Sequence, residues 1–476
     1  MSQITFGTDG WRAVIAQDYT FDNLTRVSRA TAAWVRDQDQ GDGSVVIAHD
    51  TRFQGAAFAR HVARVFAADG VRVRLADGFA TTPAVSWATA EQGASAGIVI
   101  TASHNPPEYN GYKIKAAFGG PATPEMIADV EARLSTVEPA SELPGYDALV
   151  EQGLIETFAL QADYVELLRD RIDVEAIKEA GTRVAYDAMY GAGQGVVTEL
   201  LGKPRVVELH HELNPGMHGR APEPIERNLA ALLKTVPDDH CAIGLATDGD
   251  ADRIGLVDEE GQFVDSHKIL ALLIKYLHQE KGLTGDIVKT FSTTDMLDRM
   301  GEAYGLTVHT TPIGFKYIAG TIVEGDVLVG GEESGGMAVK GHLPERDGLY
   351  IGLTVAEMMV KRERTLSGLV RELMDEFGPH YQARTDLRTT EARKQAVLAT
   401  LSDGLAEVDG QPVTATETLD GFKFRLDGGW LLFRASGTEP VLRVYSEASS
   451  PEKAEALVAW GVSMVTEGDP VPIGDA

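Results

Sequence analysis

Short apolar runs that end in loops containing Gly or Asp recur in pairs along this chain of 476 residues. Amphipathic stretches typical of helices lie between them. Strands that alternate with helices form layered α/β domains whose ligand loops lie at the strand ends, so the pattern predicts three similar α/β domains with mixed sheets sandwiched by helices. The apolar runs are residues 45–48, 97–100, 184–186, 242–246, 287–288 and 327–329, and the expected helices are residues 21–36, 53–69, 162–177 and 268–279.

The pattern changes after Phe377 to short strands at residues 421–426, 430–434 and 442–446, followed by a last helix at residues 451–465. This predicts a smaller C-terminal α+β domain. Domains usually contain about 100 to 150 residues, so four are expected in a chain of this length. Polar or proline-bearing stretches place them at residues 1–145, 146–256, 257–376 and 377–476, with the serine, metal, sugar and phosphate loops described below in that order.

The formal net charge of −28 argues against a nucleic-acid or membrane partner, because nucleic acids and anionic membranes both require a positive field. A small phosphorylated ligand needs only a local cluster of Arg and Lys. The single cysteine, Cys241, is expected to be an inert core thiol. Neither a signal peptide nor a membrane span is predicted, so the cytoplasm is the expected location. The sequence predicts no particular oligomeric state.

The segment TASHNP, residues 101–106, displays one serine in a turning loop directly after an apolar run. Ser103 has His104 beside it and Lys113 shortly downstream, so nearby donors could hold a charged group on this serine. A serine in such a loop is usually only a turn residue. Its interpretation as a reactive group therefore depends on the other loops of the chain.

The segment DGDADR sets Asp248, Asp250 and Asp252 at alternate positions after a predicted strand. Three carboxylates at this spacing can converge on one hard cation, and oxygen-only ligation favours Mg²⁺. A calcium loop of the helix–loop–helix type shares the spacing, but this segment lacks the required Gly and the closing Glu. A plain acidic turn is the other alternative.

Two further loops carry closely spaced polar groups. GEESGG, residues 331–336, offers acceptors from Glu332 to Ser334 that suit neighbouring sugar hydroxyls, although a solvated acidic hairpin would have the same composition. RASGTEP, residues 434–440, is denser in phosphate donors than a turn requires. Its donors are Arg434, Ser436, Gly437 and Thr438, with Arg443 one strand position further on.

Together with FGTDGWR at residues 6–12 and TPIGFKYI at residues 311–318, these loops resemble the α-D-phosphohexomutase family, specifically its phosphoglucomutase and phosphomannomutase members. The resemblance runs from near the N-terminus to the last domain in the family's order. It implies an intramolecular phosphotransferase of the isomerase class, with Mg²⁺ as cofactor, a hexose 1,6-bisphosphate as activator and a phosphorylated hexose as substrate.

The resemblance also implies a role for each loop. The serine that matches Ser103 is phosphorylated in the resting enzyme and completes the metal shell of Asp248, Asp250 and Asp252. Its phosphoryl group moves to the 6-hydroxyl of a hexose 1-phosphate, the bisphosphate turns around, and the 1-phosphoryl group returns to the serine. The candidates for catalysis are Ser103, His104, Lys113 and Arg253, and those for substrate binding are Arg12, Lys316, Glu332, Ser334, Arg434, Ser436, Gly437 and Thr438. Either His104 or Lys113 could be the general base or acid.

Substrate preference depends on GEESGG. The double Glu resembles phosphoglucomutases, whereas dual-specificity phosphomannomutases carry Met, and phosphoglucosamine mutases Gln, after the first Glu. Gly336 stands where the dual-specificity group has a histidine. Lys316 is therefore the expected cationic partner of the substrate. We therefore expect a phosphoglucomutase that interconverts glucose 1-phosphate and glucose 6-phosphate, with a phosphomannomutase or dual-specificity phosphohexomutase as the alternative.

Other interpretations have less support in the sequence. A non-catalytic sugar-phosphate-binding relative would be expected to lose the serine or an aspartate, yet all are present. A phosphatase would have to admit water to the phosphoserine. The His-rich segment at residues 210–218 lacks helical spacing for a metal because a Pro-Gly pair interrupts it, and the glycine-rich turn at residues 190–195 is weak evidence for a nucleotide.

Overall fold

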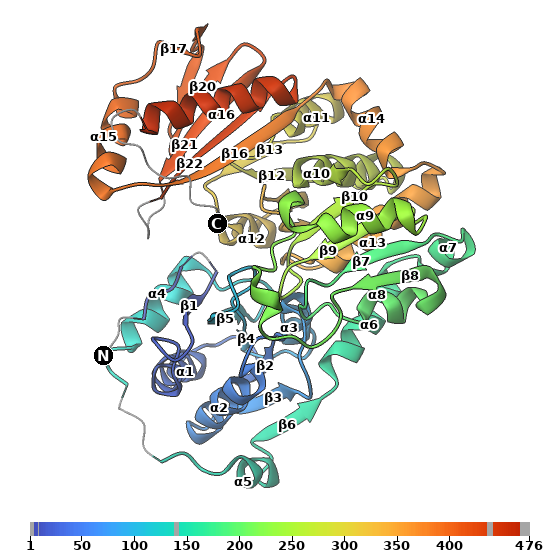
Figure 1. Ribbon diagram of the computed structural model, residues 1–476. Helices are drawn as coiled ribbons and strands as arrows, with labels where there is room; N and C mark the ends of the chain where they lie inside the picture. Colours follow the sequence, from blue (N-terminus) through green and yellow to red (C-terminus); the bar gives the residue numbers. More distant parts are fainter. Residues whose placement is uncertain (1–3, 8, 138–141, 436–440, 467–476) are drawn as a thin grey trace. The chain divides into compact units, whose positions relative to one another are not determined.

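The computed structural model describes residues 4–7, 9–137, 142–435 and 441–466. The chain forms two compact units, one of residues 1–288 and 314–369 and the other of residues 289–313 and 370–476 (Figure 1). In the part of the chain that is described, no helix is both long and apolar enough to cross a bilayer. The four predicted domain ranges remain predictions, since this division follows other borders.

The first unit begins with a mixed six-stranded sheet in the order β1-β5-β4-β2-β3-β6. Four strands, β2, β3, β4 and β6, are parallel, whereas β5 is antiparallel to both β1 and β4. The strands are β1 (Trp11–Val14), β2 (Ser44–His49), β3 (Arg72–Ala76), β4 (Ala96–Ile100), β5 (Tyr109–Ala116) and β6 (Ile155–Phe158). The helices are α1 (Phe21–Arg36), α2 (Gly55–Ala68), α3 (Thr82–Glu91), α4 (Pro124–Arg133) and α5 (Tyr146–Glu151).

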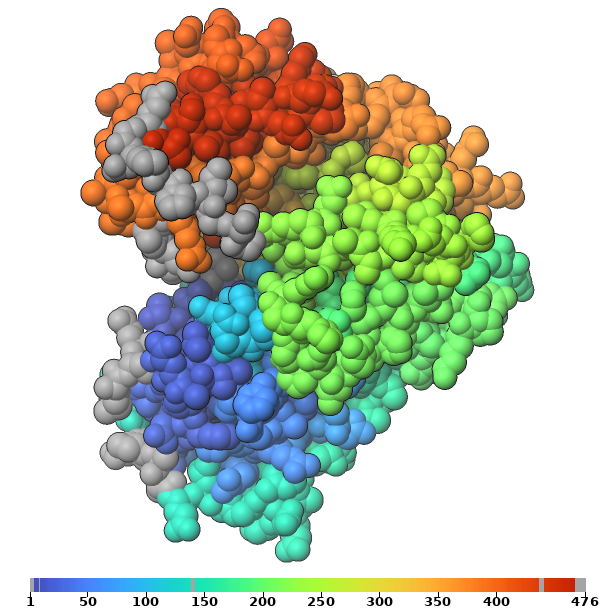
Figure 2. All heavy atoms as spheres, viewed as in Figure 1, coloured from blue at the N-terminus to red at the C-terminus, as the bar shows by residue number. Residues whose placement is uncertain are grey.

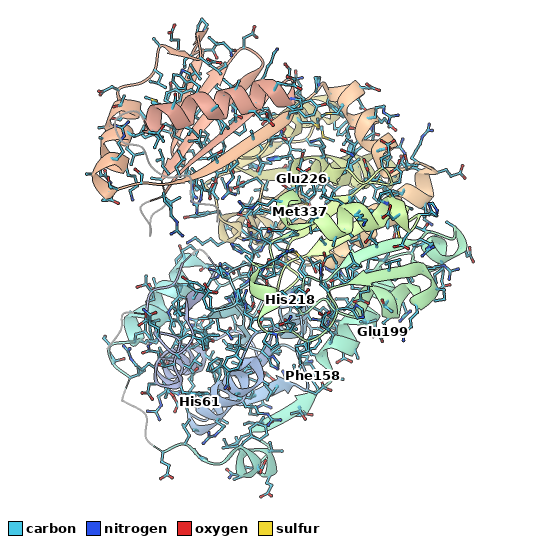
Figure 3. All side chains as sticks on the ribbon, viewed as in Figure 1. His61, Phe158, Glu199, His218, Glu226 and Met337 are labelled. Carbon is cyan, nitrogen blue, oxygen red and sulfur yellow. The ribbon has the colours of Figure 1, made fainter. Side chains whose placement is uncertain are left out.

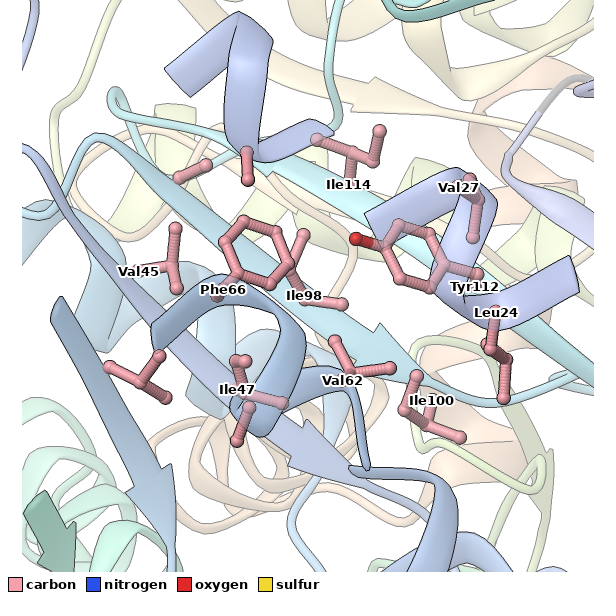
Figure 4. Packing of buried hydrophobic residues seen from close by; sticks show 14 of the residues in the cluster. Leu24, Val27, Val45, Ile47, Val62, Phe66, Ile98, Ile100, Tyr112 and Ile114 are labelled. Carbon is pink, nitrogen blue, oxygen red and sulfur yellow. The ribbon is translucent and has the colours of Figure 1, made fainter. Parts of the chain in front are cut away.

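Helices cover both faces of this sheet. On one face, Ile98 of β4 belongs to a buried apolar cluster with Val27 of α1 and Phe66 of α2 (Figure 4). On the other face α3 lies close, because a Cβ atom added to Gly97 would be 2.9 Å from Cγ1 of Val85. Successive residues of a strand point to opposite faces, so β4 contributes to both cores.

The next part of the first unit contains a five-stranded sheet in the order β11-β10-β9-β7-β8. Its strands are β7 (Val184–Asp187), β8 (Val206–Leu209), β9 (Ile243–Thr247), β10 (Ile254–Val257) and β11 (Phe263–Val264). β7 is parallel to β8 and β9, and β10 is antiparallel to β9 and β11. Every residue of β9 is buried, as expected for a central strand. The helices are α6 (Leu160–Arg171), α7 (Val174–Glu179), α8 (Val196–Leu201) and α9 (Ala230–Asp238).

The region of the five-stranded sheet lies directly beside the region of the six-stranded sheet. In the space-filling view, green atoms of the former meet blue and cyan atoms of the latter (Figure 2). The N–H group of Thr82, at the start of α3, donates a hydrogen bond of 2.9 Å to the carbonyl oxygen of Asp250, which follows β9. The loops after β4 and β9 therefore belong to one compact body.

The remaining part of the first unit contains three helices and a β-hairpin whose two strands belong to a four-stranded sheet. Strand β14 (Val327–Gly331) pairs antiparallel with β15 (Met337–Val339), so the GEESGG segment forms the turn between them. The helices are α10 (Ser266–Lys275), α12 (Phe315–Glu324) and α13 (Gly348–Arg362), and β12 (Asp286–Thr290) and α14 (Leu366–Phe377) cross the border to the second unit.

The second unit contains an antiparallel sheet in the order β16-β22-β21-β20-β19, which confirms the predicted α+β region. Its strands are β16 (Tyr381–Arg388), β19 (Ala415–Glu417), β20 (Phe422–Leu426), β21 (Gly429–Ala435) and β22 (Val441–Ala448), with β17 (Glu407–Val408) and β18 (Gln411–Pro412) as a separate pair. The predicted last helix corresponds to α16 (Pro451–Thr466), whereas α15 (Glu391–Ser402) was not predicted. The elements α11 (Met296–Tyr304) and β13 (Val308–Thr311) also belong to this unit.

Two predicted helices differ from the structure in detail. The single helix expected at residues 162–177 is divided into α6 and α7, because the Asp173 side chain accepts a hydrogen bond of 3.0 Å from the N–H group of Ala176 and caps a new helix. The helix expected at residues 268–279 begins at Ser266 and continues beyond Lys275 as a π-helical turn, residues 276–280. Three α/β regions followed by a smaller α+β region agree with the predicted fold class.

Candidate active site

Ser103 follows the end of β4 in a strained turn. Its backbone has a φ of 53°, in the left-handed region that residues with side chains rarely adopt. Its N–H group donates a hydrogen bond of 2.9 Å to Oγ1 of Thr101. Strain of this kind persists where the surrounding structure enforces it, and it often marks functional sites.

The side chain of Arg52, in the loop after β2, enforces this conformation. Its Nη2 atom donates to the carbonyl oxygens of Ser103 and Asn105, at 2.7 and 2.5 Å. Its Nη1 atom donates to the carbonyl oxygens of Pro106 and Tyr109, at 2.8 and 3.0 Å. One buried guanidinium therefore holds four backbone groups of the serine loop.

Asp50 is the carboxylate partner of Arg52. Its Oδ2 atom lies 3.2 Å from Nε of Arg52 and accepts a hydrogen bond of 2.6 Å from Thr101 Oγ1. Burial raises the pKa of Asp50 to about 6, although the charge of Arg52 opposes the shift. The sequence pattern gave no indication of a role for Asp50 or Arg52, although both lie in a loop that follows an apolar run.

The aspartate loop after β9 contacts the serine loop directly. Ser103 Oγ donates a hydrogen bond of 2.7 Å to Asp248 Oδ2, and the other carboxylate oxygen of Asp248 accepts from the N–H groups of Asp252 and Arg253 at 3.0 and 3.2 Å. A Cβ atom added to Gly249 would lie only 2.5 Å from the carbonyl oxygen of Ser103. Glycine is therefore required where the two loops meet.

Asp248, Asp250 and Asp252 are fully buried and offer ligand atoms that lie within 4.8 Å of one another. Burial and the charges of its two neighbours raise the pKa of Asp248 well above its usual range. Within the described residues, Oδ1 of Asp250 and Oδ1 of Asp252 are buried without a hydrogen-bond donor. Buried carboxylate oxygens without donors fit a hard divalent cation.

Lys113 contacts two aspartates of the loop, Asp250 and Asp252, whereas Ser103 contacts Asp248. Its Nζ atom is 2.8 Å from Asp250 Oδ2, 2.9 Å from Asp252 Oδ2 and 2.7 Å from Asp9 Oδ2. Burial opposes its charge, but Asp250 and Asp252 outweigh burial and raise the pKa of Lys113. All three donor directions of this ammonium thus point at carboxylates, so Lys113 is a fixed cation.

His104 lies beside the serine hydroxyl, with Nδ1 3.2 Å from Ser103 Oγ. Burial, followed by the charge of Arg253, lowers the pKa of His104 well below its usual range. A neutral imidazole at this distance has a ring nitrogen able to accept a proton. The two candidates for proton transfer therefore differ, because His104 can accept a proton and Lys113 is held in its charged form.

Arg346, just before α13, was not found by sequence analysis. Its guanidinium contacts the Asp9 carboxylate, and its Nη2 atom lies 2.6 Å from Asp252 Oδ2. Burial disfavours ionisation of Asp9, but Arg346 and Lys113 outweigh it and hold the pKa of Asp9 well below its usual range. Asp9 belongs to the FGTDGWR segment, so its place in a recognised motif was an available signal. Arg346 lay outside every motif.

The GEESGG turn lies next to the aspartate loop. The N–H group of Ile254, two residues after Asp252, donates a hydrogen bond of 3.1 Å to the carbonyl oxygen of Gly335. Glu332 is buried, and Ser334 is half-buried. Burial raises the pKa of Glu332 to about 7, while the nearby charge of Arg346 opposes the shift.

Three other predicted residues of the first unit lie around this cluster. Arg12 donates from Nη1 to Asn105 Oδ1 at 2.7 Å, which places it at the serine loop. Arg253 lies 4.0 Å from Asp252 through Nε and 3.8 Å from Glu223 through Nη1. Lys316 lines a separate cavity together with Asp9, Phe6 and Glu131.

Arg434 belongs to the second unit, where Nε lies 3.1 Å from Asp420 Oδ2. Arg443 likewise pairs with Asp386, at 3.1 Å. Both arginines therefore have carboxylate partners within their own unit. The predicted phosphate donors Ser436, Gly437 and Thr438 lie outside the described residues.

The His-rich segment does not form a metal centre. Nδ1 of His210 lies 2.8 Å from Asp187 Oδ1, and the ring of Tyr190 contacts the rings of both His210 and His218. His218 is labelled in Figure 3. Among the residues that the structure describes, the three aspartates are the only group of His, Cys, Asp or Glu with metal-ligand geometry. His210 and His218 instead line a pocket together with Tyr190.

Known protein families match the chain over most of its length. The models for "Phosphoglucomutase/phosphomannomutase, alpha/beta/alpha" domains I, II and III match residues 3–141, 162–261 and 265–377, and the model for the C-terminal domain matches residues 385–459. The order of the four models is the order of the loops along the chain.

Relatives of similar length share about a third of the residues. A phosphoglucomutase/phosphomannomutase of Thermococcus kodakarensis is 33% identical, with 97% of this chain and 98% of the relative covered. A probable phosphoglucosamine mutase of Methanopyrus kandleri is 31% identical, with 95% of each chain covered. A solved structure from Thermus thermophilus, provisionally named a phosphomannomutase, has a TM-score of 0.85 and 36% identity, with 98% of this chain and 99% of that chain covered.

Proposed function

Because the chain belongs to the phosphoglucomutase/phosphomannomutase family and is therefore a phosphohexomutase, we propose that it interconverts glucose 1-phosphate and glucose 6-phosphate through a phosphorylated Ser103. The observation that carries the proposal is the hydrogen bond of 2.7 Å between Ser103 Oγ and Asp248 Oδ2, at the edge of three buried carboxylates. A hydroxyl in this position is next to a cation site, and phosphoryl transfer requires alignment and charge neutralisation above all.

Asp248, Asp250 and Asp252 would hold Mg²⁺, and Oδ1 of Asp250 and Oδ1 of Asp252 have no hydrogen-bond donor within the described residues. When bound, Mg²⁺ supplies positive charge that stabilises the phosphoryl group during transfer. Lys113 adds a second positive charge within 3 Å of Asp250 and Asp252. A hexose 1,6-bisphosphate would act as activator by restoring any serine that has lost its phosphoryl group.

The reaction consists of two transfers in opposite directions. In the first, the bond between Ser103 Oγ and phosphorus breaks, a bond forms from phosphorus to the 6-oxygen of glucose 1-phosphate, and the 6-hydroxyl proton passes through a base to the departing Oγ of Ser103. In the second, the 1-phosphoryl group of the bisphosphate moves to Ser103 Oγ, and the serine proton passes through the same group to the departing 1-oxygen. We assign the proton transfer to His104, because its Nδ1 atom is 3.2 Å from Ser103 Oγ and Lys113 is committed to three carboxylates.

Glu332 and Ser334 are proposed to bind the 3- and 4-hydroxyls of the sugar. Arg12, Arg253 and Lys316 are proposed to contact substrate phosphate, together with Arg434, Ser436, Gly437 and Thr438 of the second unit. Glucose is preferred because GEESGG carries two glutamates. The named relatives include both phosphoglucomutase/phosphomannomutase and probable phosphoglucosamine mutase, so mannose 1-phosphate is the alternative substrate and glucosamine 1-phosphate the second comparison.

Initial rates test this proposal. Glucose 1-phosphate, mannose 1-phosphate and glucosamine 1-phosphate are compared at equal concentrations, each with Mg²⁺ and a trace of its own 1,6-bisphosphate. We expect the glucose rate to exceed the other two by at least tenfold. Equal glucose and mannose rates would establish a dual-specificity enzyme. Absence of turnover with all three would favour a non-catalytic sugar-phosphate-binding protein.

A further inference from the structure

Gly336 has no room for a side chain, and its backbone does not require glycine. A Cβ atom added there would lie 2.3 Å from Cδ and 3.0 Å from Cγ of Arg346, and 3.3 Å from Glu332 Oε2. Its φ lies outside the left-handed region, unlike that of the preceding Gly335, at +92°. Side-chain contact, and not backbone conformation, is therefore what excludes a larger residue.

The space above Gly336 is occupied by the stem of Arg346. This side chain is 5% exposed, and its guanidinium lies between the two loops that the reaction needs. Nη2 is 2.6 Å from Asp252 Oδ2 in the carboxylate cluster, and Nη1 is 3.8 Å from Glu332 Oε2 in the GEESGG turn. Cζ of Arg346 lies 5.3 Å from the ring centre of Phe315, a distance at which the guanidinium charge is attracted to the ring face.

Arg346 also shares its partners with Lys113. Both cations contact Oδ2 of Asp9 and Oδ2 of Asp252, so Asp9 and Asp252 are each held from two sides. Within the described part of the chain, the Lys113 ammonium contacts no carboxylate of the GEESGG turn, whereas Arg346 reaches Glu332. A planar guanidinium can bridge carboxylates in this way because its donors point in several fixed directions.

We propose that Arg346, passing over Gly336, is a positioning residue that holds Glu332 as a carboxylate ready to accept hydrogen bonds from sugar hydroxyls. This inference rests on the proposed function, in which Glu332 contacts the sugar. The cation that lies beside Glu332 is Arg346, ten residues beyond the glycine. The pair Gly336 and Arg346 acts as one unit, because a side chain at the first position would displace the second.

The charge state of Glu332 supports this role. Its pKa is about 7 in a buried setting, and the groups that face it are Arg346, Glu333, Arg253 and Asp252. Arg346 lowers the pKa, whereas Glu333 and Asp252 raise it. Without Arg346 the pKa of Glu332 would rise further, so a larger fraction of this carboxyl would be protonated at neutral pH and would offer one acceptor oxygen fewer.

A double-mutant cycle of Glu332→Gln and Arg346→Met tests the proposal on the full-length enzyme, with kcat and KM measured for the preferred sugar phosphate. We expect each single substitution to lower kcat/KM at least tenfold, largely through KM in the case of Glu332→Gln. Arg346 acts through Glu332, so Glu332→Gln should cost less than twofold further in the Arg346→Met background. Losses that multiply in the double variant would overturn the proposal.

A second comparison removes no charge. Gly336→Ala places a methyl group against Arg346, and we expect at least a tenfold loss of kcat/KM. Gly320→Ala in α12 is the matched control, because a Cβ atom there meets nothing within 4 Å, and it should stay within twofold of the parent. Equal activity of the two alanine variants would contradict the proposal.

The pH dependence of kcat/KM separates positioning from folding. The acidic limb of Arg346→Met should move to higher pH than that of the parent, and Arg346→Lys should restore part of the shift. If Arg346→Met does not fold, as judged by circular dichroism and thermal unfolding, Arg346→Lys and Gly336→Ala carry the test. Because the parent enzyme and Ser103→Ala are assayed alongside, failure of the phosphoserine mechanism would be visible separately from failure of this inference.

Discussion

Replacement of Arg52 by Met is the perturbation that should reveal how strongly the fold holds its reactive serine. Met keeps an unbranched apolar side chain but is shorter than Arg and has neither a charge nor a hydrogen-bond donor. It would remove four hydrogen bonds, of 2.5 to 3.0 Å, to backbone carbonyls of the serine loop. It would also leave Asp50, now 3.2 Å from Nε of Arg52, as a buried carboxyl without its cation.

The expected loss of stability is about 3 to 5 kcal/mol, the usual result of breaking a buried ion pair by removing one partner. Hydrogen bonds from a charged donor contribute roughly 1.5 to 3 kcal/mol each, so four of them would sum to more than this. The sum overstates the effect because the bonds share one donor group and are not independent. Asp50 can also take up a proton, since burial already raises its pKa to about 6.

Two assays check this expectation. Denaturant unfolding gives the change in the free energy of unfolding, and initial rates under saturating substrate give the change in turnover, which should fall at least a hundredfold because Ser103 would leave its strained conformation. The control is Arg72→Met, which removes an arginine whose side chain is 58% exposed and pairs with Asp42 at 3.4 Å. Such an exposed pair contributes about 0 to 1 kcal/mol. A loss below 1 kcal/mol for Arg52→Met, with normal turnover, would refute the reasoning.

The other predictions concern the second unit and the contact between the two loops. Lys423 Nζ lies 4.5 and 4.3 Å from the ring centres of Phe291 and Trp430, and burial lowers its pKa to about 8. The pKa of a lysine in the unfolded chain is about 10.5. The stability that neutral Lys423 contributes is therefore complete above this pH, and it is lost as the pH falls from there through 8. Measured by denaturant unfolding, the stability of the parent relative to Lys423→Met should fall by about 3 kcal/mol over this window, and a constant difference would show that the ammonium is not desolvated. Gly249→Ala places a methyl group 2.5 Å from the carbonyl oxygen of the serine, so the loops must separate and turnover should fall at least tenfold, whereas Gly78→Ala, with open space around it, should change the rate less than twofold.

Local pattern was sufficient to predict the elements that present the candidate site. The apolar runs at residues 97–100 and 242–246 became β4 and β9, which are buried along their whole length. Because both strands are central, the loops that follow them lie close together, and the Ser103 and Asp248 side chains meet there. Periodicity also predicted a helix at residues 21–36, which are the bounds of α1 in the structure. The helix begins there because the Thr20 side chain accepts a hydrogen bond from the N–H group of Asn23 and caps the first turn.

Interactions between distant segments had no signal in the sequence. Arg346 contacts Asp9 across 337 positions, and no motif around Arg346 indicated this contact. The contact requires that Gly336 has no side chain, because the stem of Arg346 passes over this residue. Only the structure shows that these two positions are neighbours. Similarly, residues 289–313 pack with the C-terminal part of the chain, although the sequence pattern assigns them to the third α/β region.

The site itself combines predicted and unpredicted parts. Carboxylates at alternate positions indicated a cation site, because that spacing is a property of adjacent residues. The cations that balance these carboxylates come from β5 and from the loop before α13, and their distances depend on how those elements pack. A net charge of −28 for the whole chain gave no indication that so many positive side chains gather at one place.

Transfer of a labelled phosphoryl group to the enzyme tests the central claim most directly. The protein is incubated with Mg²⁺ and glucose 1,6-bisphosphate labelled with ³²P, separated from free sugar, and digested to locate the label by mass spectrometry. The account predicts close to one phosphoryl group per chain, on Ser103 alone, and its release into sugar phosphate when unlabelled glucose 1-phosphate is added. Absence of label in the parent, or equal label in Ser103→Ala, would contradict the account.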